Sequence, residues 1–258
     1  MAFSNNVVSK NLGLKVIVLL TDFGSSEYVG MMKGVIYSIN PNAKIDDLTH
    51  DVTQQSVREG AWILLNSYRF FPKGSTFVAV VDPGVGTSRA SVLVQTQNYN
   101  FIAPDNGLLY PSVVQDGIEK ISNINIKDPE SVTFHGRDVY AKFAAYFSID
   151  DYSSFIGATK KSLDVKLEFS IDGRSGEIVH IDRFGNIITN LPPLQKDQYS
   201  VVHRGEQRSI NWVSTYEYGP ENEIFLVTGS SGTLELSMKN GSAREELPSA
   251  VGEPIIIE

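Results

Sequence analysis

Two residues of opposite charge stand at the end of an apolar run in the stretch VVDPGVGTSR. Asp82 follows the five apolar residues FVAVV directly, and Arg89 comes back after a loop of one proline and two glycines. Loop formation accounts for the proline and the glycines but not for an acid placed directly after a buried segment. We therefore treat Asp82 as a candidate functional residue, with Arg89 across its loop.

Other polar side chains also follow predicted strands, and ligands of open α/β sheets bind at the carboxyl ends of strands. These residues are Asp22, His50, Asp51, Asp105, Asn106, His135, Arg137 and Asp138. Most of them have a structural explanation as well: Asp-Asn-Gly is a turn sequence, Asp138 is a candidate helix cap or first-turn acid, and Arg137 is a candidate ion-pair partner. His180 and His203 lie in or beside predicted strands, and we expect them to be structural. His135, between a phenylalanine and a glycine, is harder to explain in this way.

A divalent-metal site is one interpretation of these acids and histidines. Its ligands would be Asp22, His50, Asp51, Asp82 and His135, but the chain has no HxH, HxxxH or HExxH spacing. The glycine-rich GVGTSR lacks the spacing of a dinucleotide fingerprint, and no phosphate-binding GxxxxGK[ST] is present. The residue types therefore permit metal or phosphate chemistry, but the spacing of these residues does not support it.

The elements that must position these residues alternate along the first two-thirds of the chain. Apolar runs at 14–20 and 75–81 predict strands buried on both faces, and a further strand begins near Ile45. Helical periodicity predicts helices over 28–39, over 56–71 with a serine cap, and from 138 onward. The run 90–104 predicts a hairpin. This order predicts an α/β fold with a mostly parallel sheet covered by helices.

The last third of the chain has a different pattern. Residues 157–174 are polar and weakly periodic, which makes them the best linker candidate. Short alternating runs separated by turn sequences follow, which is typical of a small antiparallel sheet or barrel. We predict an N-terminal α/β domain over residues 12–165 and a smaller C-terminal β-barrel domain over residues 175–258.

Composition narrows the function classes. The chain has 258 residues, a formal net charge of -8 and no cysteine. The negative charge argues against a nucleic-acid partner, and the missing cysteines exclude thiolate chemistry and fit the cytoplasm. The first residues lack the pattern of a signal peptide, and no apolar run approaches the ~20 residues that span a bilayer. We expect a cytoplasmic protein.

Taken together and in order, several motifs resemble one family. They are LLTDFGSSEYVGMMKGVIYSINP, THDV followed by VREGAW, FFPKGSTFVAVVDPGVGTSR, APDNGLLYP, TFHGRDVYAKFAA, IDRFGNIITN and GSSGTLELSMKNGSA. The combination is similar to the S-adenosyl-L-methionine (SAM) hydrolases that form adenosine, also called SAM hydroxide adenosyltransferases, which are relatives of fluorinase and chlorinase. The resemblance implies that an activated water attacks the 5′-carbon of SAM and that L-methionine leaves. It implies no metal and no cofactor.

The resemblance also implies roles for individual residues. The catalytic triad would be Asp82, Arg89 and His135, with Arg89 favouring hydroxide and the other two orienting water and handling its proton. The remaining residues would bind SAM: Asp22 the ribose hydroxyls, Phe184, Asn186 and Tyr216 the adenine, Asp182 and Ser230 the methionine ammonium, and Ser231 its carboxylate.

The resemblance further implies a homotrimer, with sites between the N-terminal domain of one subunit and the C-terminal domain of its neighbour. Three positions favour hydrolysis over halogenation. Asp82 and His135 stand where the halogenating relatives have tyrosines, and Gln55 stands where they carry tryptophan, whereas a halide site must be apolar. Lys142 replaces a usual proline on a helix. A SAM- or nucleoside-binding regulator without turnover remains a third interpretation.

Overall fold

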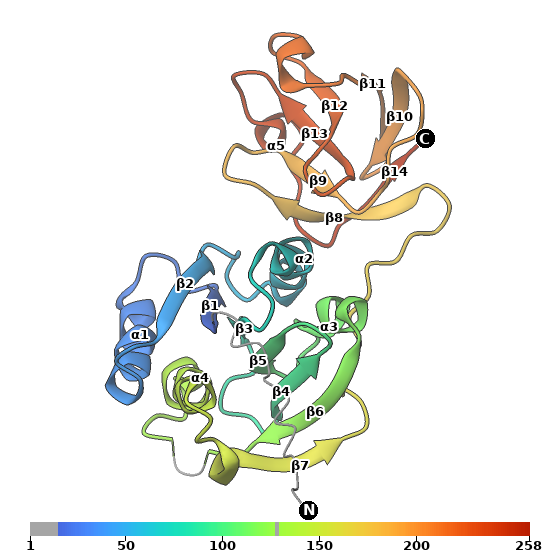
Figure 1. Ribbon diagram of the computed structural model, residues 1–258. Coiled ribbons are helices and arrows are strands. Elements are labelled where there is room, and N and C mark those ends of the chain that lie inside the picture. The colour runs from blue at the N-terminus through green and yellow to red at the C-terminus, as the bar shows by residue number, and fades with distance from the viewer. Residues whose placement is uncertain (1–14, 127–128) are drawn as a thin grey trace, which may run out of the picture. The chain divides into compact units, whose positions relative to one another are not determined.

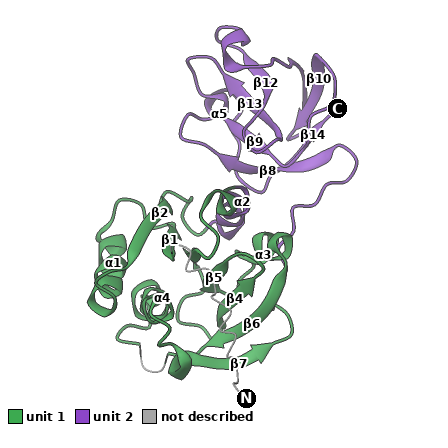
Figure 2. Cartoon of the chain, viewed as in Figure 1, with its two compact units in different colours: residues 1–55, 67–165 green, residues 56–66, 166–258 purple. Residues whose placement is uncertain are grey.

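The computed structural model describes residues 15–126 and 129–258, which form two compact units (Figure 2). The first contains residues 15–55 and 67–165, and the second contains residues 56–66 and 166–258. Residues 12–14 of the predicted first domain, and the segment considered as a signal peptide, lie outside the described residues. The second unit thus takes in a helical segment from the middle of the predicted first domain.

A seven-stranded sheet forms the centre of the first unit (Figure 1). Its order is β2-β1-β3-β5-β4-β6-β7, with parallel pairing of β2, β1, β3 and β5. Because β6 pairs antiparallel with β4 and β4 antiparallel with β5, β6 also runs with the parallel strands, so that only β4 and β7 oppose them. The predicted mostly parallel sheet is confirmed. The strands are β1 (Val16–Thr21), β2 (Lys44–Thr49), β3 (Thr76–Val80), β4 (Ser91–Thr96), β5 (Asn100–Pro104), β6 (Ile118–Ile124) and β7 (Ile156–Lys160).

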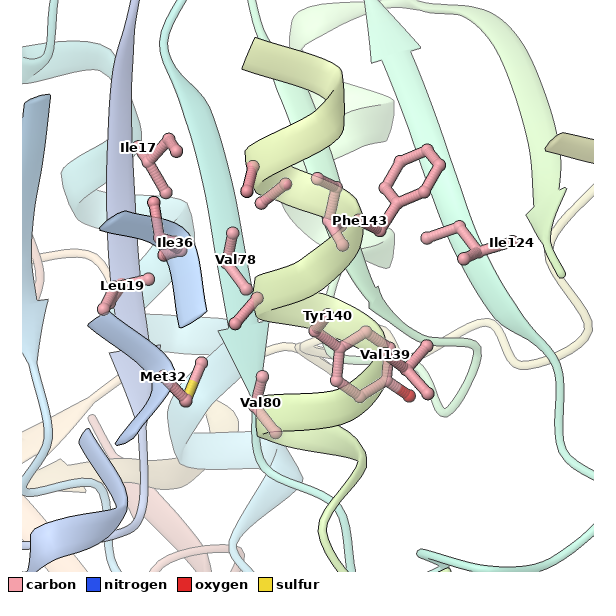
Figure 3. Close-up of a cluster of buried hydrophobic side chains, with 14 of the residues drawn as sticks. Ile17, Leu19, Met32, Ile36, Val78, Val80, Ile124, Val139, Tyr140 and Phe143 are labelled. Carbon is pink, nitrogen blue, oxygen red and sulfur yellow. The ribbon is translucent and has the colours of Figure 1, made fainter. Parts of the chain in front are cut away.

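Helices of the first unit cover this sheet, as predicted. They are α1 (Glu27–Ile39), α3 (Tyr110–Asp116), the π-helical segment η2 (Gly136–Ala141), α4 (Lys142–Ser148) and the 3-10 turns η1 (Tyr68–Phe70) and η3 (Ser153–Phe155). Side chains of α1, η2 and α4 pack on one face, where Met32, Ile36 and Phe143 meet strand residues (Figure 3). This core supports the start of η2, which directly follows His135.

Side chains of β3 pack on both faces of the sheet, because successive residues of a strand point to opposite faces. Val78 and Val80 face the α1 and α4 side, while Phe77, next to Val78, stacks on Phe101 at 5.2 Å on the other side. All five residues of β3 are buried, as predicted for a strand covered on both faces. Packing on both faces therefore fixes β3, which ends two residues before Asp82.

The second unit is a nearly closed antiparallel barrel, which confirms the second part of the predicted fold. Its strand order is β11-β10-β14-β8-β9-β13-β12, and Trp212, just after β11, bridges to Leu226 of β12. The apolar interior includes Ile178, Tyr199 and Leu236. The elements are β8 (Ser175–Ile181), β9 (Ile187–Thr189), β10 (Gln198–His203), β11 (Glu206–Asn211), the 3-10 turn η4 (Tyr216–Tyr218), β12 (Ile224–Thr228), β13 (Leu234–Met238), α5 (Ala243–Glu246) and β14 (Pro254–Ile257).

Helix α2 (Val57–Ser67) packs on this barrel. Arg58 pairs with Glu177, Glu59 accepts a hydrogen bond from His180 Nδ1 at 2.6 Å, and Trp62 packs beside Val179 of β8. Apolar packing, one ion pair and one hydrogen bond therefore explain why residues 56–66 group with the C-terminal strands.

The linker prediction over residues 157–174 is wrong at its first residues. Residues 157–160 belong to β7, which pairs with β6 at the edge of the first sheet. This strand was not predicted because it is an edge strand with exposed positions, so that its alternation of apolar and polar residues is weak.

Candidate active site

Asp82 and Arg89 meet at the end of β3. An Arg89 Nη2 N–H donates to Asp82 Oδ2, and the side chains of Asp82 and Arg89 are only 6% and 14% exposed, respectively. The backbone N–H of Gly84 donates to Asp82 Oδ1 at 3.2 Å, so the loop itself holds the carboxylate. The chain thus folds back so that Arg89, seven positions after Asp82, forms a largely buried ion pair with it.

Arg89 is held in turn by the helical layer. Its Nη1 donates to the carbonyl of Ala90 and to the hydroxyl of Tyr140, both at 3.2 Å. Tyr140 is fully buried in the core below and also accepts a hydrogen bond from Ser91 Oγ at 3.1 Å (Figure 3). The guanidinium is therefore fixed on two sides.

Burial controls the protonation of Asp82. Desolvation raises the pKa of the Asp82 carboxyl above its ordinary value, while the charge of Arg89, the Gly84 N–H and His135 pull the pKa down. The net result is a raised pKa. A carboxylate with a raised pKa is a stronger base than an exposed aspartate, yet it remains stabilised by its arginine.

His135 lies on the wall of two cavities of the first unit. The first, of about 480 Å³, is also lined by Asp82, and the second, of about 490 Å³, is also lined by Arg89. The chain has four histidines, all in its described part, and the other three have side-chain partners: His50 bonds Thr21, His180 bonds Glu59 and His203 bonds Glu253. The ring of His135 makes no hydrogen bond to any residue between 15 and 126 or 129 and 258. Its nitrogens are left for a ligand, water or proton.

The cavity that contains Asp82 and His135 also has an aromatic wall. Phe23, Tyr28 and Phe134 meet edge to face, with ring centroids 5.1–5.9 Å apart. Asp22 lies on the same cavity, and its Oδ2 accepts a hydrogen bond from the backbone N–H of Gln55 at 2.8 Å. The predicted residues Asp22, Asp82 and His135 are thus brought together. The aromatic wall was missed, since its rings come from the loop after β1, from α1 and from the loop before η2, more than 100 residues further along the chain.

A further cavity, of about 730 Å³, lies in the second unit. Asp182, Phe184, Asn186 and Tyr216 of the predicted site line it together, with Phe184 71% and Tyr216 50% exposed. Residues that the sequence did not single out complete the lining: Met238, Asn240, Gly241, Ser242 and Glu245. Two exposed aromatic rings beside polar groups are suited to bind a flat heteroaromatic ring.

The carboxylate of Asp182 organises the loop that carries Phe184 and Asn186. Oδ1 accepts the backbone N–H groups of both residues at 2.8 and 2.9 Å, and Oδ2 accepts the Asn186 amide at 2.8 Å. Gly185 has φ +81° and packs against Ser242 so closely that a Cβ would overlap the serine hydroxyl. Most of the acceptor capacity of Asp182 is therefore used inside the loop, which leaves one lone-pair direction for a ligand.

Ser230 and Ser231 lie in the turn between β12 and β13 and are not part of the lining of this cavity. Ser231 Oγ is 2.9 Å from Thr233 Oγ1, and Ser230 is exposed. The structure of the second unit thus gathers four of the six residues expected there.

The other candidates of the sequence have structural partners. Asp105 is buried and binds Lys160, and Asn106 Nδ2 donates to the carbonyl of Val81 at 2.8 Å, next to Asp82. Arg137 pairs with Asp138 at 2.5 Å, as the structural explanation of Arg137 predicted. Asp138 lies in the first turn of η2, as predicted for a first-turn acid, and is not its cap. Asp51 is exposed and lines none of the three cavities described above.

Within residues 15–126 and 129–258, no three His, Cys, Asp or Glu side chains converge as a metal-ligand set. The five residues considered as ligands therefore do not form one cluster there. No helix in the same part of the chain is long and apolar enough to cross a membrane.

The fold and the two groups of site residues define an α/β unit with a buried Asp–Arg pair beside a free histidine, followed by a β-barrel with an aromatic cavity. A family model described as the SAM hydroxide adenosyltransferase N-terminal domain matches residues 17–155, and the corresponding C-terminal domain model matches residues 176–256. The chain belongs to the SAM hydroxide adenosyltransferase family.

Individual relatives agree with this assignment. The chain is 37% identical over 251 residues to a protein of Methanocaldococcus jannaschii named (R)-S-adenosyl-L-methionine hydrolase, with 89% of this chain and 91% of the relative covered. A fluorinase of Actinoplanes is 30% identical over 76% of this chain and 78% of its own. A crystal structure of an uncharacterized conserved protein from Thermotoga maritima superposes with a TM-score of 0.86 at 32% identity, over 94% of this chain and 100% of that chain.

Proposed function

We propose that this protein hydrolyses S-adenosyl-L-methionine to adenosine and L-methionine. The observation that carries the proposal is the buried Asp82–Arg89 pair beside the unpartnered His135, in a chain that belongs to the SAM hydroxide adenosyltransferase family. Relatives of similar length named SAM hydrolase support the same reaction.

In the proposed reaction, a water molecule attacks the 5′-carbon of the adenosyl group. The carbon–oxygen bond forms as the carbon–sulfur bond breaks, and its electron pair goes to sulfur, so methionine leaves as a neutral thioether. No acid is needed on the leaving group. The difficult step is to hold the water in line and take its proton, which are tasks for Asp82 and His135, with Arg89 stabilising negative charge on the oxygen.

The position of His135 supports a route for that proton. Its ring lines the cavity shared with Asp82 and also the cavity shared with Arg89, Asn123 and Ser91. A proton taken up beside the substrate can therefore leave through the second cavity while the substrate still occupies the first cavity. Asp82, with its raised pKa, and His135 act as a pair in this scheme.

The charges of the cavities favour a cationic substrate over a nucleotide. Asp22 and Asp82 line the cavity of about 480 Å³ in the first unit, and Asp182 and Glu245 line the cavity of about 730 Å³ in the second. Among the described residues, no lysine or arginine lines either of these two cavities. A sulfonium and an ammonium group are attracted to such surfaces, whereas phosphates are repelled. Within this proposal Asp22 binds the ribose, Phe184, Asn186 and Tyr216 bind adenine, and Asp182, Ser230 and Ser231 bind the amino-acid part.

Incubation of the purified protein with SAM tests the proposal. Adenosine and methionine should form in equal amounts, and in ¹⁸O-labelled water the label should appear on the adenosine 5′-oxygen. Formation of no adenosine, or of unlabelled adenosine, would overturn it. Activity that is lost with a chelator and restored by zinc or manganese would favour the metal-dependent alternative, and tight SAM binding without product would favour a regulator.

The family resemblance also leads us to propose a homotrimer whose sites use residues of neighbouring subunits, in the cytoplasm. Native mass spectrometry should give a mass of three chains. Mixing a triad variant with a variant of the second unit, each inactive alone, should restore part of the activity if subunits share sites.

A further inference from the structure

A buried carboxylate under the cavity of the second unit has no role in the proposed reaction so far. Glu235 of β13 is 5% exposed. No lysine, arginine or histidine in the described part of the chain forms an ion pair with it. Burying a carboxylate without a cation is costly, so this side chain depends on hydrogen-bond donors.

The hydroxyl of Tyr216 is the principal donor. It donates to Glu235 Oε1, which also accepts from Ser237 Oγ at 3.1 Å. Burial raises the pKa of Tyr216 above its ordinary value, and the hydrogen bond to Glu235 raises it further. The phenol therefore stays protonated, and the donor stays in place.

This bond restrains a ring that is otherwise weakly held. Tyr216 begins the single turn η4, is half exposed, and meets Phe225 edge to face at 6.4 Å. One edge contact leaves the ring free to swing about its two side-chain torsions. A hydrogen bond at the far end of the ring fixes its direction over the cavity.

The other oxygen of Glu235 supports a second part of the site. A Cβ at Gly229 would overlap Glu235 Oε2, so the carboxylate packs directly against the start of the β12–β13 turn. That turn carries Ser230 and Ser231. Glu235 thus connects the aromatic side of the cavity to the turn expected to bind the amino-acid part of the substrate.

We propose that Glu235 is a positioning residue, which orients the ring of Tyr216 for stacking on the purine. The inference rests on the proposed function, because it takes Tyr216 as a ring that contacts adenine. Glu235 acts through Tyr216 and belongs to a different unit from Asp82, Arg89 and His135. Its loss should therefore weaken binding and spare the chemical step.

The test compares Glu235→Met, which removes the acceptor, Tyr216→Phe, the double variant and the exposed control Glu223→Met. Calorimetry gives the Kd of adenosine, and initial rates give KM and kcat for SAM. Each single variant should raise Kd and KM about tenfold and leave kcat within about twofold. The double variant should bind about as weakly as either single one, since both remove the same hydrogen bond. Glu223→Met should match the parent protein.

Two outcomes overturn the inference: unchanged adenosine affinity in Tyr216→Phe, or a double variant whose effects multiply. The first remains decisive if Glu235→Met does not fold by circular dichroism, because Tyr216→Phe removes only the hydroxyl of a half-exposed residue. Failure of the proposed function is distinguishable, since the unmodified protein would then form no adenosine from SAM, whereas failure of this inference leaves that reaction intact and shows only in the variants.

Discussion

The carboxylate of Asp82 and the guanidinium of Arg89 form a largely buried ion pair across the loop that leads from β3 to β4. The pair is only seven residues apart in the chain, so the loop determines it locally. Its environment comes from further away, from Tyr140 under Arg89 and from His135 beside Asp82. Burial raises the pKa of Asp82, and Arg89 opposes the rise.

Asp82→Asn should remove the base and keep the shape of the side chain. We expect kcat/KM for SAM to fall about 10²–10⁴-fold, the usual contribution of a general base. Adenosine binding should change little. Asp151→Asn, an exposed aspartate, is the control for loss of one negative charge. Full activity of Asp82→Asn would contradict the assigned role.

Arg89→Gln should move the acid limb of the pH profile. Arg89 lowers the pKa of Asp82 against the effect of burial, so its removal should raise that pKa further. Because the ionised carboxylate is the active form, the acid limb of kcat/KM should shift to higher pH, and the maximum rate should fall. Arg69→Gln should leave the limb in place. A shift to lower pH would show that another group controls the limb.

Asp105→Asn should affect stability and not chemistry. Asp105 is buried, binds Lys160 and accepts the backbone N–H of Asp164 at 3.1 Å. We expect the free energy of unfolding in urea to drop by about 2–3 kcal/mol, because the lysine loses a buried anion. Asp164→Asn removes the exposed partner of the same lysine and should have a much smaller effect. Folded Asp105→Asn protein should hydrolyse SAM at the parent rate.

Gly185→Ala should damage the loop that we propose to bind adenine. Its added methyl would overlap Ser242, whereas the same change at Gly205 meets open space. The two glycines have φ of +81° and +82°, so the backbone strain is matched and only the contact differs. We expect the KM for SAM to rise at least about tenfold for Gly185→Ala and to stay near the parent value for Gly205→Ala. Equal effects would mean that backbone strain alone matters.

Local patterns were enough to predict much of this molecule. The apolar run before Asp82 specifies a buried strand, and proline and glycine specify a short loop. Ten consecutive residues are therefore enough to bring Asp82 and Arg89 together. The hairpin of β4 and β5 was predicted in the same way and is confirmed. Periodicity also separated the α/β part from the barrel.

Strand β7 and the packing of α2 on the barrel could not be predicted from periodicity. Exposed positions conceal an edge strand, and the contacts of α2 with Glu177 and His180 join residues 119 and 121 positions apart. No local pattern shows which of two apolar surfaces a helix will cover. That choice depends on the total area and charge that each surface offers after folding.

The same limit applies to the candidate site. Residue types and the family resemblance point to Asp82, Arg89, His135 and the aromatic residues of the barrel, because their chemistry is visible in single motifs. The wall of Phe23, Tyr28 and Phe134 and the bond from Tyr216 to Glu235 arise only in the folded chain. A hydrogen bond or ring contact requires angstrom-scale proximity, and for residues far apart in the chain only tertiary packing provides it.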